Sequence, residues 1–203
     1  MVVDRQGRRF TDEGLAGVAV ANAIARLEDP LGTVAIFDRA IWEASGKTYV
    51  MSANPFLVET GATFYRAETI EALAAQAGLP PATLAETVAR YNQAVDNVAL
   101  ARLDPARSGD FGHVWGSKAL PIRVPPFFAV PLCAGITYTM GGLAVDAAAR
   151  VLDRNGQPIK GLYAAGGTIG GLEGGPVTGY SGGLAKALVF GKIAGDSIGS
   201  RDA

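Results

Sequence analysis

The sequence has 203 residues, 49% of them hydrophobic and 18% charged, so a folded core is expected and global disorder is excluded. The 18 Lys and Arg residues nearly balance the 19 Asp and Glu residues, and a net charge of -1 gives no electrostatic basis for binding nucleic acid or an anionic membrane. The single cysteine, Cys133, excludes an intrachain disulfide and a cysteine-based zinc site, and the single histidine, His113, excludes a histidine-rich metal site.

The N-terminal residues predict a hairpin, with strands at 1–3 and 8–10 around a turn at 4–7. A hairpin that starts at the first residue has no preceding partner, so we expect this chain to be part of a larger fold. Residues 15–28 are rich in alanine and predict a helix that ends before Pro30. Residues 33–37 predict a buried strand.

Two helices are predicted in the middle of the chain. Residues 68–77 predict a helix closed by Gly78, since glycine is the common residue just past a helix end. The next helix begins near Pro81, and its apolar stripe has the spacing of a helix that packs one face on a core. The stripe consists of Leu84, Val88, Tyr91 and Val95.

The C-terminal half begins with a long irregular stretch. Residues 96–127 contain many Gly and Pro residues and predict a boundary between two lobes, with a mobile hinge at 105–126. Residues 127–132 predict an extended segment, 143–145 a short strand, and Asn155-Gly156 a hairpin turn between 151–152 and 161–165. Helices and antiparallel strands in this order predict an α+β fold.

Glycine is concentrated in the last third of the chain, because residues 135–203 hold 17 of the 27 glycines. The layout of 161–195 is a strand, a glycine loop and a helix from about Gly182, and backbone N–H groups at a helix start attract electron-rich ligands. The alternative to a ligand-binding loop is a loop whose glycines serve only the geometry of its turns. On the helix, a face of small residues is expected to pack closely on a sheet: Leu184, Ala187, Leu188, Gly191 and Gly195.

Three phosphate-binding or catalytic motifs were compared with the sequence. The dinucleotide fingerprint G-x-G-x-x-G is absent from these 203 residues, and a P-loop ending at Gly46-Lys47-Thr48 fails because Ile41 holds the first glycine position. Gly179-Tyr180-Ser181-Gly182-Gly183 matches the nucleophile elbow of serine hydrolases. No histidine follows Ser181, so a serine hydrolase remains only a remote alternative.

Four segments together resemble the C-terminal part of the fumarate reductase/succinate dehydrogenase flavoprotein family, which includes 3-ketosteroid dehydrogenases and tricarballylate dehydrogenase-like proteins. They are DRQGRRFTDE at 4–13, LAETVARYN at 84–92, TMGGLAVD at 139–146 and GLYAAG at 161–166. The resemblance implies an FAD-dependent oxidoreductase in which hydride passes between flavin N5 and a C–C bond next to a carbonyl or carboxylate. It also implies that 1–15 is a hairpin of the FAD domain, 16–122 a helical and mixed cap domain, and 123–203 the C-terminal segment of an incomplete Rossmann-like FAD-binding domain.

The same resemblance implies roles for particular residues. Met140, Gly141 and Gly142 would lie beside the flavin ring. The backbone contacts to the flavin would come from a second group: Gly166, Gly167, Gly182, Gly183 and Leu184. The candidate catalytic residues are Tyr138 and Tyr180, each as a proton relay, with a tyrosine packed on the flavin or in the core as the alternative reading.

The sequence also departs from fumarate reductases. Tyr138 stands where they carry a histidine, and residues 172–183 contain no arginine for a substrate carboxylate. The usual acidic residue after the flavin strand is Gly167, and the proton-donating cap arginine would fall near Trp42 rather than Arg39. We therefore expect a small-molecule substrate other than fumarate.

Cofactor and partner expectations follow from the absent fingerprint. Without G-x-G-x-x-G, the chain alone is expected to bind FAD weakly or not at all, and an apolar surface left by the missing N-terminal FAD region is expected to drive self-association. The alternative is a non-enzymatic cap-domain fragment or binding module without flavin. No signal peptide and no run of ~18 apolar residues is present, so we expect a cytoplasmic protein without membrane partners.

Overall fold

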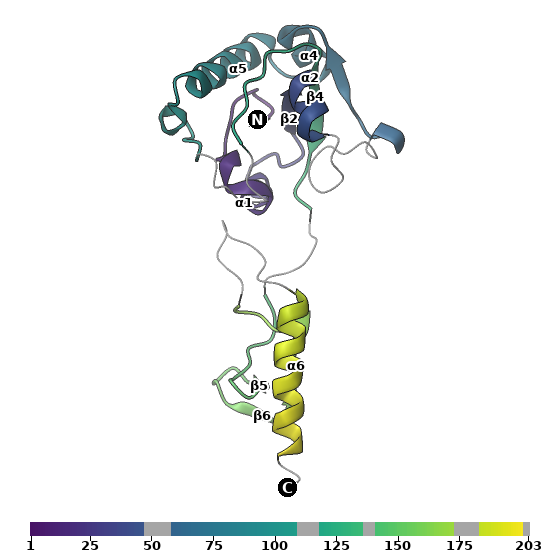
Figure 1. Ribbon diagram of the computed structural model, residues 1–203, viewed down its shortest axis with the longest axis vertical. Coiled ribbons are helices and arrows are strands. Elements are labelled where there is room, and N and C mark those ends of the chain that lie inside the picture. Colours follow the sequence, from purple (N-terminus) through teal and green to yellow (C-terminus); the bar gives the residue numbers. More distant parts are fainter. Residues whose placement is uncertain (47–57, 109–117, 136–140, 173–182, 201–203) are drawn as a thin grey trace. The chain divides into compact units, whose positions relative to one another are not determined.

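The computed structural model describes residues 1–46, 58–108, 118–135, 141–172 and 183–200. The chain forms two compact units, Met1–Ala134 and Gly135–Ala203 (Figure 1). Both contain helix and strand, which confirms a mixed helical and sheet protein. No helix in these described ranges is both long and apolar enough to cross a membrane.

The first unit is built on a four-stranded sheet with the order β1-β2-β4-β3, in which every neighbouring pair is antiparallel. The strands are β1 (Val2–Val3), β2 (Thr33–Asp38), β3 (Tyr65–Ala67) and β4 (Phe127–Leu132). The predicted strand at 33–37 and the extended segment at 127–132 are confirmed, and they pair with each other over their full length. The predicted return strand at 8–10 is reduced to a single bridge between Val3 and Arg9, whose side chain is buried.

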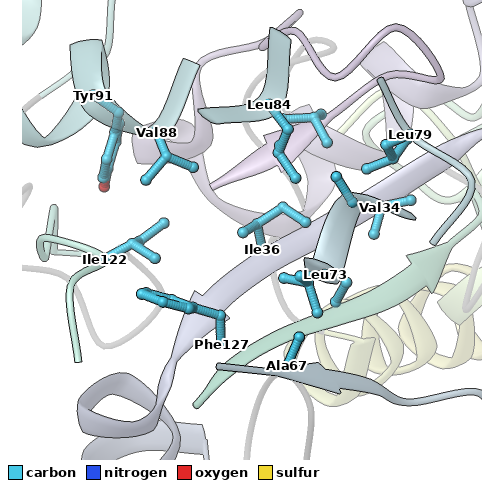
Figure 2. Close-up of a cluster of buried hydrophobic side chains, with 13 residues drawn as sticks. Val34, Ile36, Ala67, Leu73, Leu79, Leu84, Val88, Tyr91, Ile122 and Phe127 are labelled. Carbon is cyan, nitrogen blue, oxygen red and sulfur yellow. The ribbon is translucent and has the colours of Figure 1, made fainter. Parts of the chain in front are cut away.

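One face of this sheet is covered by helices. Among the described residues of the first unit, the α-helices with printed bounds are α1 (Ala16–Ile24), the short α2 (Arg39–Ile41), α4 (Ile70–Gln76) and α5 (Pro81–Asp96). The short helical segment η1 (Glu13–Leu15) precedes α1, η2 (Trp42–Gly46) follows α2, and η3 (Leu100–Arg102) follows α5. Ile36 of β2 and Phe127 of β4 meet Leu73 of α4 and Leu84 of α5 in the main core, as Figure 2 shows. Because side chains alternate along a strand, Phe37 and Phe128 lie on the opposite face in a second, aromatic cluster.

The predicted helical stripe is confirmed in α5. Leu84, Val88 and Tyr91 are buried, and Val95 packs against the same core as a partly buried residue. The predicted helix at 15–28 is too long, because α1 ends at Ile24. Turns closed by hydrogen bonds between residues three apart follow it. These turns let the chain reverse before Gly32 and enter β2. The helix predicted at 68–77 is observed as α4, capped by the Thr69 side chain.

The two described ends of the predicted hinge at 105–126 are hydrogen-bonded to other residues of the first unit, and the mobility of the segment stays a prediction. Ser108 donates its backbone N–H to Asp12 at 2.9 Å. At the other end, the buried Asp38 carboxylate accepts backbone N–H groups from Arg123 at 2.7 Å and Val124 at 2.8 Å. These bonds hold 108 and 123–124 to the first unit, so the described ends of the segment do not form a loose linker.

The C-terminal end of α5 carries a strained residue. Val98 has φ +52, in the left-handed region. Its N–H donates to the Val95 carbonyl, and the Ala99 N–H donates to the Ala94 carbonyl. This is the C-terminal capping geometry in which glycine is usual, but the residue here is valine. The left-handed region costs an L-residue roughly 1–2 kcal/mol. We therefore expect Val98→Gly to raise the free energy of unfolding of the first unit by about 1 kcal/mol in a urea titration, partly offset by glycine's greater freedom in the unfolded chain.

A matched substitution keeps this prediction falsifiable. Leu31 is also an exposed apolar residue, at 75% exposure, but it has no positive φ. Leu31→Gly is expected to leave stability unchanged or lower it. A stabilisation by Val98→Gly no larger than that of Leu31→Gly would contradict the assigned strain.

The second unit is small. The predicted hairpin around Asn155-Gly156 is confirmed as β5 (Arg150–Leu152) and β6 (Pro158–Tyr163), with Gly156 at φ +76. The predicted strand at 143–145 is present only as two isolated bridges, one from Leu143 to Ile169 and one from Val145 to Val151. A 3-10 turn, η4 (Gly166–Thr168), and a long helix, α6 (Gly183–Gly199), complete the unit (Figure 1).

Candidate functional site

Two glycine-containing segments of the second unit lie side by side. Leu143 and Ile169 form a parallel bridge, Leu143 N–H donates to the Thr168 carbonyl at 2.8 Å, and Gly170 N–H donates to the Leu143 carbonyl at 3.2 Å. The turn η4 precedes this contact and packs on α6. The structure therefore brings together the segments at 141–143 and 166–170, which are far apart in the sequence.

Gly142 and Gly170 make this contact sterically feasible. A Cβ atom on Gly142 would lie 2.5 Å from the Thr168 carbonyl oxygen and 2.6 Å from the Gly170 nitrogen. A Cβ atom on Gly170 would lie 2.6 Å from the Gly142 nitrogen. Both positions therefore require glycine so that two backbones can approach each other.

Other glycines leave backbone uncovered. Gly141 and Gly167 are exposed, and a Cβ atom on either would meet no atom within 4 Å. Gly166 has φ +69, and its added Cβ atom would lie 3.5 Å from the Ala187 Cβ atom of α6. The backbone at Gly141 and Gly167 is therefore accessible, with no side chain of its own and no neighbouring atom where a Cβ atom would lie.

Most of the predicted small-residue face of α6 is exposed. Leu184 is 83% exposed and Leu188 is 73% exposed, and nothing lies within 4 Å of an added Cβ atom on Gly191 or Gly195. Leu184, Leu188, Gly191 and Gly195 of the predicted face are thus not covered by a sheet within the second unit, and the close packing of this face stays a prediction. The buried residue of the helix is Lys186, and the turn η4 is the element that packs on the helix.

Lys186 is a residue of this region that the sequence analysis missed. Its side chain is 8% exposed, and its ammonium group donates to the Ile169 carbonyl at 3.1 Å. It thereby links α6 to the segment that touches Gly142. The sequence gives little indication that Lys186 is buried, because a single lysine among apolar helix residues is more often exposed.

The predicted site residues divide into two groups. Gly141, Gly142, Gly166 and Gly167 lie around the contact just described, and Gly183 and Leu184 begin α6. The remaining candidates lie outside the residues that the structure describes: Tyr138, Met140, Tyr180 and Gly182. The hydrolase motif at 179–183 falls on the same undescribed stretch, with Gly183 as its one described member.

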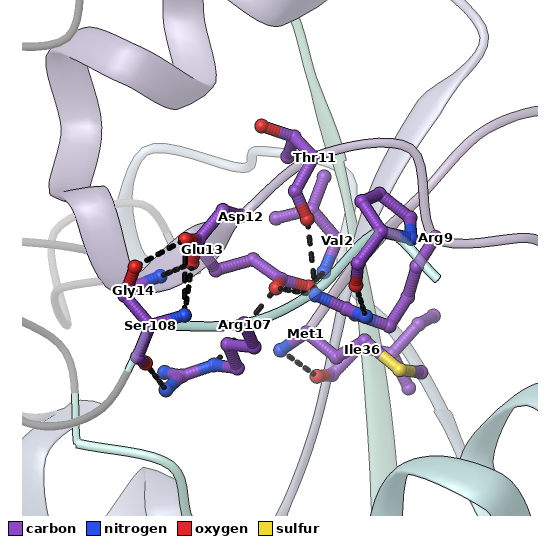
Figure 3. Close-up of polar contacts among 11 residues, drawn as sticks. Met1, Val2, Arg9, Thr11, Asp12, Glu13, Gly14, Ile36, Arg107 and Ser108 are labelled. Atoms are coloured by element: carbon purple, nitrogen blue, oxygen red, sulfur yellow. Dashed lines mark hydrogen bonds and ion pairs between the residues drawn. The ribbon is translucent and has the colours of Figure 1, made fainter. Parts of the chain in front are cut away.

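The first unit contains a buried ion cluster (Figure 3). Glu13 accepts from Arg9 Nε at 3.1 Å and Nη2 at 2.6 Å, and from the Val2 backbone N–H at 3.0 Å. Arg107 Nε lies 3.9 Å from the same carboxylate. All three side chains are less than 10% exposed, which is rare for charged groups unless they are paired.

This environment shifts the pKa of two neighbouring groups. Burial by itself raises the pKa of Glu13, but the hydrogen bonds from Arg9, the nearby amino terminus and the charge of Arg9 outweigh it, so the pKa is below its ordinary value. Burial also raises the pKa of Tyr91, whose ring lies 6.0 Å from the Arg9 guanidinium carbon. The cluster fixes the N-terminal segment to residues 105–108, since Arg9 also donates to the Pro105 carbonyl at 2.6 Å.

Within the described ranges, no group of three His, Cys, Asp or Glu side chains is arranged to hold a metal ion. Cys133 is exposed and has a free thiol. The candidate site of the second unit is thus made of backbone and small residues rather than of metal ligands.

Comparison with protein families matches residues 1–181 to the model described as "FAD binding domain". NADH:acrylate oxidoreductase of Vibrio harveyi is 31% identical over 210 residues, which cover 96% of this chain and 18% of that protein. A probable fumarate reductase of Shewanella frigidimarina is 32% identical over 197 residues, covering 97% of this chain and 30% of that protein. 4-Oxocyclohexanecarboxylate 2-dehydrogenase of Sinomonas cyclohexanicum is 31% identical over 226 residues, which cover 100% of this chain and 37% of that protein.

Solved structures give matches of the same kind. A 3-ketosteroid delta1-dehydrogenase from Sterolibacterium denitrificans, in complex with 1,4-androstadiene-3,17-dione, has a TM-score of 0.71 and 26% identity over 99% of this chain. The open conformation of a flavocytochrome c3 fumarate reductase has a TM-score of 0.58 and 30% identity over 97% of this chain. The chain covers 38% and 32% of those two chains, and 18–37% of the three relatives above.

Proposed function

Because this chain belongs to the FAD binding domain family, whose cofactor is FAD and whose named relatives are oxidoreductases, we propose that it forms part of an FAD-dependent oxidoreductase. In this proposal residues 1–15 and 123–203 belong to the FAD domain, and residues 16–122 form the cap over the substrate. The fold partition into a cap and a Rossmann-like segment is part of the proposal.

The observation that carries the proposal is the contact between Gly142 and Gly170 with open glycines beside it. Two backbones meet there, and Gly141 and Gly167 present no side chain. Bound FAD would supply hydride exchange at N5 of its ring. The chain would hold the ring through backbone groups of 141–142, 166–167 and 182–184, and Met140 would pack beside it.

The proposed reaction joins a hydride to, or removes it from, one carbon of a C–C bond next to a carbonyl or carboxylate. The names of the relatives support this class, because acrylate, fumarate and 4-oxocyclohexanecarboxylate all carry such a group. Tyr138 and Tyr180 are the proposed proton relays at the neighbouring carbon. A hydrogen-bond donor near the carbonyl or carboxylate oxygen would stabilise the charge that develops there.

The deciding experiment uses a polypeptide extended along the reading frame upstream of Met1. We expect that stretch to encode a strand followed by G-x-G-x-x-G, which supplies the pyrophosphate site that these 203 residues lack. The extended protein is expected to purify with stoichiometric flavin and either to reduce the C=C bond of an enone or enoate or to dehydrogenate a saturated C–C bond next to a carbonyl or carboxylate. A protein that takes up no flavin would favour the alternative of a non-enzymatic cap fragment or binding module.

The 203-residue chain by itself is expected to bind FAD weakly. The helix-terminal pyrophosphate site usually supplies charge-assisted hydrogen bonds from backbone N–H groups, and its fingerprint is absent here. Equilibrium dialysis with FAD should therefore give less than one flavin per chain at concentrations that saturate the extended protein. Stoichiometric flavin on the 203-residue chain would contradict this expectation.

The exposed face of α6 predicts self-association of the 203-residue chain. Leu184 and Leu188 are one helical turn apart, and exposed leucines on one face favour burial against another copy. We expect sedimentation velocity to show oligomers at micromolar concentration and Leu188→Lys to shift the population toward monomer. Ala185→Lys adds the same charge at a neighbouring exposed position, and an equal shift for both variants would contradict a role of the leucine face.

A further inference from the structure

An apolar pocket of about 430 Å³ lies on the aromatic face of the sheet in the first unit. Phe128 of β4 contributes to its wall, and its strand neighbour Phe127 faces the main core instead. Trp42 and Phe64 complete the aromatic wall, and Pro126 and Val58 add apolar surface. Its volume falls within the usual range of small-molecule sites, about 300–1,000 Å³.

The aromatic wall is held by ring contacts. Ring centroids lie 5.3 Å apart for Trp42 and Phe64, 5.2 Å for Phe64 and Phe128, and 6.2 Å for Trp42 and Phe128. Phe37, which is buried, stacks behind Phe128 at 5.4 Å. Rings within this range of distances stabilise each other in offset or edge-to-face arrangements, so the wall is preorganised for another ring.

Two arginines, Arg39 and Arg66, line the same pocket. Arg66 of β3 is directly opposite Phe128 of β4, and Arg39 begins α2 immediately after β2. Both are exposed, and neither guanidinium has an ion pair among the residues that the structure describes. Glu43 is the acidic residue of the lining, so the cationic side chains exceed the anionic one by a single charge.

We propose that this pocket binds a cyclic carboxylate, with its ring against Trp42, Phe64 and Phe128 and its carboxylate at Arg39 and Arg66. An apolar ring gains from leaving water for an aromatic wall, whereas an acyclic dicarboxylate such as fumarate has little apolar surface to bury. Planar guanidinium groups bind carboxylates through paired, charge-assisted hydrogen bonds. This inference deepens the proposed function, on which it rests, by naming a ring-bearing class of substrate.

Trp42 provides a direct measurement of occupancy. The sequence has one other tryptophan, Trp115, which lies outside the described residues, so a Trp115→Phe background leaves Trp42 as the sole indole. Cyclohexanecarboxylate, which does not absorb near the tryptophan band, is titrated against Trp42 fluorescence, and succinate and cyclohexanemethanol serve as acyclic and uncharged probes. We expect cyclohexanecarboxylate to bind at least about tenfold more tightly than either, a difference of about 1.4 kcal/mol.

Arginine variants test the carboxylate contact. Arg39→Gln and Arg66→Gln are each expected to weaken cyclohexanecarboxylate binding by about tenfold, because each removes a charge-assisted hydrogen bond, and to leave cyclohexanemethanol binding unchanged. Arg90→Gln is the control, since Arg90 is an exposed arginine of α5 that does not line this pocket. The proposal is overturned if the three probes bind equally, if none binds, or if the Arg90 variant loses as much affinity as the other two.

The titration requires neither FAD nor turnover, so its outcome separates two failures. Loss of ring binding in a chain whose extended form takes up flavin and turns over an acyclic enoate overturns the pocket assignment and leaves the proposed function in place. Ring binding in a chain whose extended form takes up no flavin supports the pocket and overturns the proposed function.

Discussion

Replacing Glu13 with Gln is expected to lower the free energy of unfolding of the first unit by about 3–5 kcal/mol, because breaking a buried ion pair leaves uncompensated charge in the interior. Arg9 loses the anion and one of its two bonds to the carboxylate oxygens, and Arg107 loses the anion 3.9 Å from its Nε atom. The three side chains are nearly inaccessible to water, so solvent cannot replace the lost partner. Urea titration followed by circular dichroism gives the measurement.

The same carboxylate predicts a dependence on pH. The pKa of Glu13 is below its ordinary value in the folded state, so its ionised form stabilises the fold above the unfolded-state pKa. That contribution is lost as the pH falls through the folded-state pKa. We expect the wild-type chain to lose stability more steeply than Glu13→Gln as the pH falls below the ordinary pKa of glutamate, because the variant carries no titrating group at this position.

An exposed ion pair of the same unit supplies the control. Arg5 and Asp29 are 2.7 Å apart, with side chains 67% and 40% exposed. Asp29→Asn is expected to cost roughly 0–1 kcal/mol, the usual range for exposed pairs. If Asp29→Asn and Glu13→Gln lowered the free energy of unfolding by equal amounts, the prediction that burial strengthens the Glu13 cluster would be contradicted.

Replacing Gly142 with Ala is expected to destabilise the second unit by about 3 kcal/mol, because the new methyl group has no space. It would lie 2.5 Å from a backbone oxygen, which cannot move aside as a flexible side chain can. The two segments must then separate, and the bonds between Leu143 and Thr168 and between Gly170 and Leu143 are lost. Hydrogen exchange at the Leu143 and Gly170 amides reports this opening directly.

Gly141→Ala is the matched control, since an added Cβ atom on Gly141 meets nothing within 4 Å. We expect its effect on stability to stay within ~0.5 kcal/mol. In the extended, flavin-loaded protein, however, the proposed function predicts that Gly141→Ala weakens FAD binding by obstructing the ring. Equal exchange rates in the two variants would contradict the close contact, and unchanged FAD affinity in the Gly141 variant would contradict a flavin beside that residue.

The glycine contact, the ion cluster and the α6 face differ in how far the sequence predicted them. The glycine segments are predicted from their composition to face a ligand, which stays a prediction, and the structure places 141–143 beside 166–170. The Glu13 cluster was not predicted, because Arg9 and Arg107 are 98 positions apart and no local pattern joins them. The partner of the α6 face was not predicted, because helical periodicity identifies a face but not the element that covers it.

The sequence by itself determined the local elements and the family. Hydrophobic spacing placed α5, β2 and β4, Asn155-Gly156 placed the second hairpin, and the four characteristic segments identified a flavoprotein. These signals are carried by residues close together in the chain, so periodicity and turn chemistry suffice to identify them.

Only the tertiary structure decided which distant residues meet. It distinguished glycines that permit backbone contact, such as Gly142, from those that leave backbone open, such as Gly141. It also paired Arg66 with Phe128 across two strands and left Leu184 exposed on α6. The physical reason is that steric fit, desolvation and charge pairing depend on neighbours in space, which strand register and helix packing determine.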